Sequence, residues 1–222
     1  MEIFYLDIDN FPQPVIDRII EIYPSGSNLK KRQIEFALGR FLVFLVGKNF
    51  YNISDTEIVI KNKKPRFLSG EINFSLSHSK NIVLAAFDKK PLGADIEFIR
   101  SRNFEKIFEY YNLFPQEKDA DTFYRFWTEY EAEIKLQKKP KSYLSVKLFR
   151  DFMLSLVSSE LLDIKSMLKI YELKSPSART KPSELMSLKL VSANNENEIT
   201  VVRQEINTAS LEFFEPLNLK TE

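Results

Sequence analysis

The stretch INFSLSHSKNIVLAAFDKKPLGADIE, residues 72–97, decides the fold class. Apolar and polar side chains alternate at the start of this stretch, a continuous apolar run follows over 82–87, and alternation returns over 92–97 after the turn DKKP. Alternation is typical of a strand with one buried face, and a short apolar run between turn residues is typical of a buried strand. We therefore expect three consecutive strands here.

The flanking segments predict helices mixed with further strands. Before this stretch we expect a strand over 1–9, a helix over 28–47 with Asn28 as N-cap and Gly47 as its stop, a strand over 57–60 and a basic turn over 61–66. After it we expect helices over 103–112 and 119–138, a helix or mixed segment over 146–169, and strands over 168–173, 186–192 and 197–204, the last two separated by a polar loop at 192–198. This succession predicts an α+β fold with a boundary near residue 100.

Composition excludes several kinds of site. The 222 residues include no cysteine and one histidine, so disulfides, cysteine nucleophiles and zinc sites built mainly from imidazoles are ruled out. The formal net charge of +1 predicts no overall attraction to nucleic acid or to an anionic membrane. The most apolar run, FLVFLV at 41–46, is far shorter than the about 20 residues that cross a bilayer, and the N-terminus does not resemble a signal peptide. We therefore expect a soluble, cytoplasmic protein.

Two acidic residues, Asp95 and Glu97, close the strand-rich stretch. Residues two apart on a strand point to the same face, so Ala94 and Ile96 would face the core and the two carboxylates the other side. Two like charges this close are unfavourable unless water surrounds them or a cation lies between them. A Mg²⁺ site and an ordinary half-exposed strand are both compatible with this pattern.

A second acidic position lies on the helix expected over 119–138. Trp127, Glu131 and Lys135 follow one another at intervals of four and form one stripe of that helix. Glu131 could be a metal ligand or general base, with Lys135 balancing phosphate charge. Alternatively, the two residues form a simple surface ion pair, worth a few tenths of a kcal/mol.

Basic residues gather on the first helix and in the turn after it. Lys31, Arg32 and Arg40 lie on the helix, and Lys64 lies in the turn. Guanidinium groups suit phosphate through paired hydrogen bonds, whereas the alternative is a solvated basic face. A close approach by another backbone segment or by a ligand would explain Gly39, which costs about 1 kcal/mol relative to Ala inside a helix.

Ser77 and His78 are adjacent, which invites a hydrolase interpretation. Adjacency in sequence is not the geometry of a catalytic triad, and no G-x-S-x-G elbow accompanies the pair. His78 could instead donate hydrogen bonds to a phosphate, or serve only as a structural residue.

The order of these motifs is distinctive. A basic helix containing Gly-Arg is followed by Lys-Pro, by F-S-L-S-H-S, by G-A-D-I-E and, some thirty residues later, by F-W-T-x-x-E-A-x-x-K. Over residues 28–136 the chain resembles the 4′-phosphopantetheinyl transferase superfamily, specifically the two-domain monomeric type that activates surfactin and enterobactin synthetases. The resemblance implies two similar α+β subdomains with pseudo-twofold symmetry, residues 1–100 and 101–222, with the active site between them.

The resemblance also implies a reaction and its residues. Coenzyme A would donate its phosphopantetheine arm to a serine of an apo acyl or peptidyl carrier protein, releasing 3′,5′-ADP. Mg²⁺, with Mn²⁺ as an alternative, would be held by Asp95, Glu97 and Glu131. Glu131 would also take the serine proton, and Lys135 would neutralise the leaving diphosphate. The coenzyme A contacts would come from Lys31, Arg32, Arg40, Lys64, Ser77, His78 and Lys135, and Trp127 would be a packing residue. No homo-oligomer would be needed, so we expect a monomer.

The chain departs from the family pattern at three places. Tyr130 stands where the family commonly has Lys, Lys63-Lys64-Pro65 replaces Gly-Lys-Pro, and Leu-Gln-Lys-Lys-Pro-Lys replaces a Gly-rich turn after the helix. Two alternatives therefore remain: a coenzyme A- or carrier-binding relative without transfer activity, and a Mg²⁺-dependent phosphohydrolase, which would need further ligands or a nucleophile.

Overall fold

The computed structural model describes residues 1–111, 117–177, 184–192 and 195–214, without the side chains of 188–198, 200 and 210. The strands are β1 (Glu2–Asp7), β2 (Ile58–Lys61), β3 (Lys64–Phe67), β4 (Asn73–Ser79), β5 (Ile82–Asp88), β6 (Leu92–Phe98), β7 (Ser142–Leu148), β8 (Phe152–Ser158), β9 (Lys169–Lys174), β10 (Leu185–Ser192), β11 (Asn195–Ile206) and β12 (Glu212–Phe214). The α-helices are α1 (Gln13–Ile22), α2 (Lys30–Asn49), α3 (Phe104–Tyr110), α4 (Ala120–Leu136) and α5 (Ile164–Met167).

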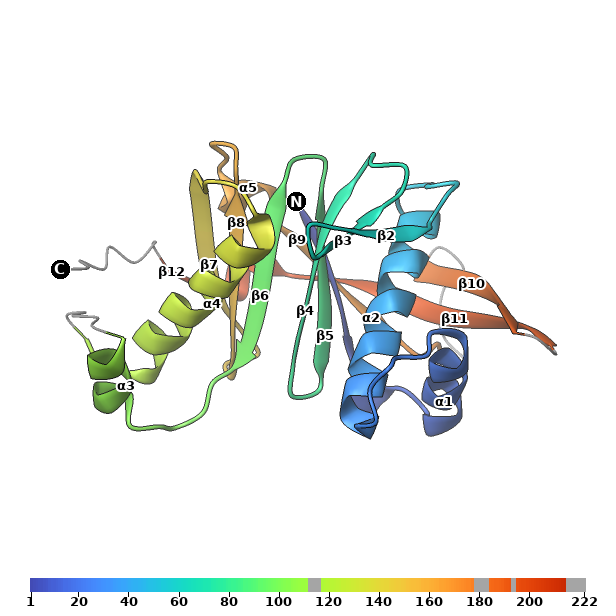
Figure 1. The fold of residues 1–222 in the computed structure, drawn as a ribbon, viewed down its shortest axis with the longest axis horizontal. Coiled ribbons are helices and arrows are strands. Elements are labelled where there is room, and N and C mark those ends of the chain that lie inside the picture. Colours follow the sequence, from blue (N-terminus) through green and yellow to red (C-terminus); the bar gives the residue numbers. More distant parts are fainter. Residues whose placement is uncertain (112–116, 178–183, 193–194, 215–222) are drawn as a thin grey trace.

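Two sheets stand at the centre of the molecule, with helices on their outer sides (Figure 1). The larger sheet has the order β10-β11-β9-β1-β5-β4, and the smaller has the order β12-β7-β8-β6. Helices α1 and α2 pack on the larger sheet, and α4 packs on β6 and β8 of the smaller one. The predicted α+β class is confirmed, whereas the pseudo-twofold symmetry stays a prediction.

Strand β1 shows how the two sheets share a core. Phe4 and Leu6 belong to the cluster between the larger sheet and its helices, whereas Ile3 and Tyr5 belong to the cluster between the two sheets. Alternate side chains of a strand point to opposite faces, so a strand buried on both sides must be apolar at nearly every position. All four side chains are buried.

Sheet pairing crosses residue 100 in both directions. Strand β6, which precedes that residue, pairs with β8 of the second half of the chain. Strand β9, which follows it, runs parallel to β1. The division into residues 1–100 and 101–222 stays a prediction, and each sheet draws strands from both parts. Within the described ranges, no helix has the length and apolar character needed to cross a membrane.

The first helix and the turn after it differ from the expectation. Helix α2 begins after Leu29, not Asn28, and continues through Gly47 to Asn49. A Cβ at Gly47 would lie 2.7 Å from the Phe67 ring, so the glycine serves packing and does not stop the helix. The basic segment 61–66 is a tight hairpin: β2 and β3 pair, and Asn62 and Lys63 between them both have positive φ.

Three further differences concern α1, the segment 146–169 and the loop at 192–198. The sequence interpretation missed α1. The segment 146–169 is mixed and mainly β, because β7 and β8 form a hairpin and only α5 is helical. The β10–β11 hairpin pairs as far as Ser192 with Asn195, so most of the predicted polar loop belongs to β11, and residues 193–194 lie outside the described part.

Gly93 allows the closest contact between α4 and the smaller sheet. A Cβ built on Gly93 would lie 1.9 Å from the carbonyl oxygen of Ala132 and 2.8 Å from the amide nitrogen of Leu136. These are backbone atoms in the middle of a helix, which cannot move aside as a flexible side chain can. Only glycine at residue 93 lets α4 lie this close to β6.

We expect Gly93→Ala to lower the free energy of unfolding by about 3 kcal/mol, because the added methyl forces α4 away from β6. Urea denaturation followed by circular dichroism measures the change. Gly26→Ala is the matched control, since a Cβ there meets no atom within 4 Å, and it should leave the stability nearly unchanged. A loss below about 1 kcal/mol for Gly93→Ala would contradict the close approach of α4.

Candidate functional site

Three serines of β4 join the edges of the two sheets. Strands β4 and β6 are the last strands of their sheets, and they lie side by side (Figure 1). Each hydroxyl accepts a hydrogen bond from a backbone amide of β6. Ser75 Oγ accepts from Ala94 at 3.0 Å, and Ser77 Oγ accepts from Ile96 at 3.3 Å. Ser79 Oγ accepts from Phe98 at 2.9 Å. Because side chains alternate along β4, the three hydroxyls lie on one side of the strand. They accept the hydrogen bonds that the backbone carbonyls of a paired strand would otherwise accept. We call this row of contacts the serine ladder.

The serine ladder also orients the two carboxylates of β6. Ser77 Oγ donates to Asp95 Oδ1 at 2.7 Å, and Ser79 Oγ donates to Glu97 Oε2 at 2.8 Å. Each hydroxyl therefore accepts from a backbone amide and donates to a carboxylate. The predicted placement of Ala94 and Ile96 in the core is confirmed, but Asp95 is buried too and is not on a half-exposed face.

The two carboxylate oxygens of Asp95 differ in their hydrogen-bond partners. Lys135 Nζ lies 2.6 Å from Asp95 Oδ1, the oxygen that also accepts from Ser77. The other oxygen, Oδ2, is buried and has no hydrogen-bond partner. Nearby, burial and the charge of Asp95 raise the pKa of Glu97, against the hydrogen bond from Ser79. The charges of Lys135 and Arg102 act in the opposite direction on Glu97, so the unpaired Oδ2 of Asp95 is the feature here that suits a bound cation.

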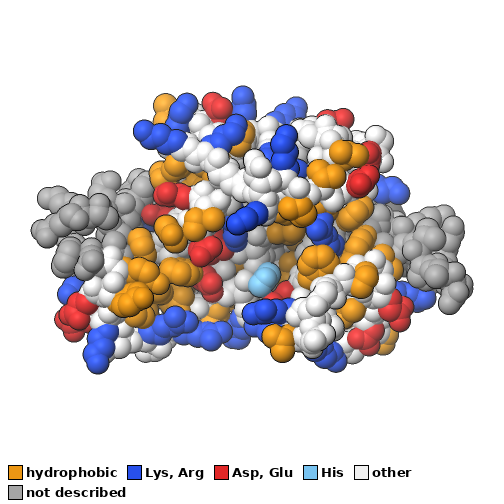
Figure 2. All heavy atoms as spheres, in the orientation of Figure 1, with side chains coloured by type: hydrophobic (Ala, Val, Ile, Leu, Met, Phe, Trp, Pro, Cys, Tyr) orange, Lys and Arg blue, Asp and Glu red, His pale blue; other side chains and the backbone are white. Residues whose placement is uncertain are grey.

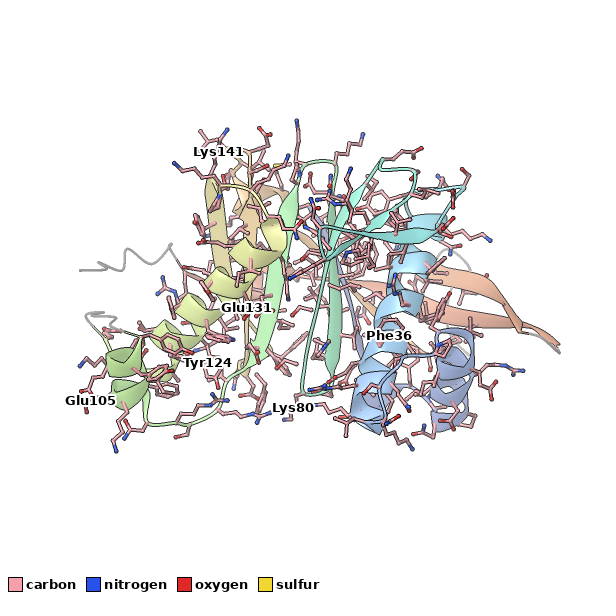
Figure 3. All side chains as sticks on the ribbon, in the orientation of Figure 1. Phe36, Lys80, Glu105, Tyr124, Glu131 and Lys141 are labelled. Carbon is pink, nitrogen blue, oxygen red and sulfur yellow. The ribbon has the colours of Figure 1, made fainter. Side chains whose placement is uncertain are left out.

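Glu131 and Trp127 lie on α4, which faces β6. We call the line along which β4 and β6 lie side by side the β4–β6 seam. Figure 3 shows Glu131 on α4, on the opposite side of this seam from α2. Its side chain is half-buried. Trp127 stacks on Phe123 with ring centroids 6.3 Å apart and belongs with the aromatic cluster of α3 and α4. Tyr130 stacks on Phe126 and is 48% exposed.

A buried polar network fixes α4 on the smaller sheet. The hydroxyl of Thr128 lies 2.6 Å from that of Ser155, which in turn lies 2.8 Å from that of Ser145. Ser145 Oγ donates to Glu129 Oε1 at 2.7 Å. Sequence reasoning missed this set, because only the fold brings α4, β7 and β8 together. The network orients the stripe that carries Glu131 and Lys135.

A preformed metal centre is not seen in the described part of the chain. No three acidic or histidine side chains there are gathered closely enough to hold a metal ion, so Asp95, Glu97 and Glu131 do not form a ready ligand set. Asp95 and Glu97 nevertheless fit a hard cation chemically, because both present carboxylate oxygens and one of those oxygens is buried without a partner.

The basic residues of α2 line a cavity of about 480 Å³ beside β4. Arg32, Arg40, Ser77 and His78 line it together with Glu35 and the apolar side chains Phe36, Ile60, Pro65, Leu76 and Val83. Figure 2 shows the single histidine in the hollowed centre of this face, between acidic and basic side chains. The structure thus brings four of the seven predicted coenzyme A residues into one cavity.

Three of the predicted coenzyme A residues lie elsewhere. Lys31 lines a neighbouring cavity of about 460 Å³. Lys135 pairs with Asp95. Lys64 is buried, and its Nζ donates to the carbonyl of Leu92 at 2.7 Å, which ties the β2–β3 hairpin to β6. Burial, with the charges of Arg66 and Lys135, lowers the pKa of Lys64 to about 8.

Comparisons with known proteins point to one family. The chain is 38% identical over 117 residues to the 4′-phosphopantetheinyl transferase Sfp of Bacillus subtilis strain 168, covering 46% of this chain and 50% of that protein. It is 28% identical over 147 residues to a putative 4′-phosphopantetheinyl transferase of Haemophilus influenzae, covering 59% and 62%. It is 32% identical over 118 residues to the 4′-phosphopantetheinyl transferase psf-1 of Bacillus pumilus, covering 48% and 51%.

The matches cover 50%, 62% and 51% of the lengths of these three relatives, less than two thirds in each case. No family model matches the chain. The curated relatives support membership of this chain in the 4′-phosphopantetheinyl transferase superfamily.

Removing the central rung of the serine ladder should destabilise the protein. Ser77→Ala leaves the amide of Ile96 without its acceptor and removes one of the two donors to Asp95 Oδ1, so we expect a loss of about 2 kcal/mol in urea denaturation. Ser166→Ala is the control, since its hydroxyl makes only an exposed hydrogen bond, and it should change stability by less than about 0.5 kcal/mol. Equal effects of the two substitutions would contradict the ladder.

Lys64 should make the free energy of unfolding rise with pH in the alkaline range. Its pKa in the folded protein, about 8, lies below the usual 10.5, so the folded state binds the Lys64 proton less tightly than the unfolded state. The destabilisation caused by this group is absent above pH 10.5, grows as the pH falls from 10.5 to 8, and is complete below pH 8. Relative to Lys64→Met, the wild type should therefore gain about 2 kcal/mol between pH 7.5 and pH 10. A constant difference between the two proteins in urea unfolding at these pH values would refute the shift.

Proposed function

We propose that this chain, as a member of the 4′-phosphopantetheinyl transferase superfamily, transfers the 4′-phosphopantetheine arm of coenzyme A to a serine of an apo acyl or peptidyl carrier protein. The observation that carries the proposal is the β4–β6 seam. Acidic Asp95 and Glu97 lie there between a cavity with arginines on one side and the Glu131–Lys135 stripe of α4 on the other. Phosphoryl transfer needs positioning and charge neutralisation of this kind.

The chemistry is a displacement at phosphorus. The carrier serine oxygen forms a bond to the phosphorus that bears pantetheine, and the bond from that phosphorus to the bridging diphosphate oxygen breaks. Adenosine 3′,5′-bisphosphate leaves, and the serine proton passes to the carboxylate of Glu131. Lys135 balances charge on the 5′-phosphate of the leaving nucleotide, because its ammonium already lies at the seam beside Asp95.

Mg²⁺ is part of the proposal, with Asp95, Glu97 and Glu131 as its ligands. The unpartnered, buried Oδ2 of Asp95 supports this assignment. When bound, such an ion would offset the charge of the diphosphate oxygens. Residues 1–100 and 101–222 each contribute to the seam, so we infer that one copy of the chain carries the whole site.

Incubation with coenzyme A, Mg²⁺ and an apo carrier protein should add one phosphopantetheine to the carrier, as measured by intact-protein mass spectrometry with and without chelator. Asp95→Asn and Glu131→Gln should slow the transfer at least 100-fold, because they remove a carboxylate from the seam. Glu57→Gln, at an exposed position in a loop before β2, is the control and should transfer at the wild-type rate.

The alternatives give different results in the same experiment. Release of inorganic phosphate from coenzyme A without carrier would favour a phosphohydrolase. Coenzyme A binding without transfer to any of several carriers would favour a binding protein, an outcome for which Tyr130 gives a structural reason. Circular dichroism verifies that each variant remains folded.

A further inference from the structure

Ser79 is the last residue of the serine ladder, and its hydroxyl proton is committed to Glu97. The hydroxyl oxygen accepts from the amide of Phe98 at 2.9 Å, and the hydroxyl donates to Glu97 Oε2 at 2.8 Å. Because a hydroxyl carries a single proton, this donation leaves none for another acceptor. Ser79 is also buried. Glu97 therefore receives a donor whose direction is set by the neighbouring strand.

The backbone that carries Ser79 is itself held in place. Strands β4 and β5 are joined directly after Ser79 by the two-residue turn Lys80-Asn81, in which Lys80 has a positive φ. Asn81 Nδ2 donates to Asp7 Oδ1 at 2.7 Å, and the carbonyl of Asn81 accepts from the amide of Ile8 at 2.8 Å. The turn is thus tied to the end of β1, which limits the movement of the Ser79 hydroxyl.

Glu97 needs such a donor because the charges around it favour other positions. The Asp95 carboxylate, two residues away on the same strand face, repels it. Glu97 lines two cavities, of about 460 Å³ and 570 Å³; Arg100 lines the first and Arg102 the second. Hydrogen bonds between a guanidinium and a carboxylate are about twice as strong as those between neutral groups. A glutamate without a fixed donor would turn from Asp95 toward one of these arginines.

A cation bound at Asp95 needs Glu97 nearby. The buried Oδ2 of Asp95 has no hydrogen-bond partner in the described part of the chain. A hard divalent cation binds oxygen ligands, and a second carboxylate beside Asp95 adds both a ligand and a compensating charge. The hydroxyl that keeps Glu97 beside Asp95 therefore acts on the cation without touching it.

Ser75 shows that the ladder itself does not require a carboxylate. Its hydroxyl oxygen accepts from the amide of Ala94 at 3.0 Å, and the hydroxyl donates to the carbonyl of Ala94 at 3.4 Å. Ser75 and Ser79 are both buried and both accept from an amide of β6. Of these two residues, only Ser79 donates to an acidic side chain. The pair separates a role in the ladder from a role in cation binding.

We propose that Ser79 is a positioning residue for the cation site, where its hydroxyl holds Glu97 beside Asp95 and thereby raises the affinity for a divalent cation. This inference rests on the proposed function, in which Asp95 and Glu97 are cation ligands. Residues that orient ligating carboxylates by hydrogen bonds typically change metal affinity by about 10–100-fold when they are replaced.

Titration of the full chain with Mn²⁺, in the presence of coenzyme A and without carrier, measures the cation affinity without any transfer. Electron paramagnetic resonance of the free Mn²⁺ gives the bound fraction. We expect Ser79→Ala to weaken Mn²⁺ binding about tenfold or more. Ser75→Ala is the matched control, because it removes the equivalent acceptor of a β6 amide, and it should bind Mn²⁺ within about twofold of the wild type. Ser79→Cys keeps the shape of the side chain but donates weakly, so it should show the same loss and serves where Ser79→Ala does not fold.

Three results would overturn the inference: an unchanged affinity in the Ser79 variants, an equal loss in Ser75→Ala, or a wild type that binds no Mn²⁺. Mass spectrometry of the carrier separates the inference from the proposed function. Transfer by the wild type together with an unchanged affinity in Ser79→Ala would overturn the inference while the function stands. The expected affinities without transfer to any carrier would sustain the inference and contradict the transfer.

Discussion

The serine ladder between β4 and β6 is the interaction on which the rest of the site depends. An edge strand buried against protein must find acceptors for its amides, and a buried amide without one costs about 1–3 kcal/mol. Here Ser75, Ser77 and Ser79 provide these acceptors at every second residue of β6. Because hydroxyls can donate as well as accept, the same contacts orient the carboxylates of Asp95 and Glu97. Ordinary backbone pairing would supply neither of these two hydroxyl donors.

A second constraint holds β6 from the other side. The absence of a side chain at Gly93 lets α4 lie against β6 with its backbone near contact at Ala132. The hydroxyl network of Thr128 fixes the rotation of that helix on β8. As a result, Lys135, which lies about one helical turn after Glu131 on α4, reaches Asp95 Oδ1 at 2.6 Å. The seam is therefore assembled by backbone proximity on one side and by hydroxyls on the other.

Features that depend on neighbouring residues could be predicted from the sequence, whereas features that depend on contacts between distant residues could not. The alternation over residues 72–97 predicted β4, β5 and β6, because the buried positions of a strand are apolar and this pattern is visible within a few neighbouring residues. The same rule did not separate β7 from β8, where a run buried on both faces resembles a buried helix. The acidic pair of β6 was visible as a motif. The role of Ser75 and Ser79 was not, since their partners lie about 19 residues away on another sheet.

Asp95 and Lys135 link the two charged halves of the site. Oδ1 of Asp95 accepts from both Ser77 and Lys135, while its buried Oδ2 accepts from nothing described. A phosphate at the seam would compete with Asp95 for the ammonium of Lys135. Movement of Lys135 toward that phosphate would leave the Asp95 carboxylate without its cationic partner, which would favour another cation there. A cation at Asp95 would in turn release Lys135 toward a phosphate. Because binding free energies couple reciprocally, each ligand should strengthen the binding of the other. With the proposed donor and cation both bound at the β4–β6 seam, this single lysine would make their binding cooperative.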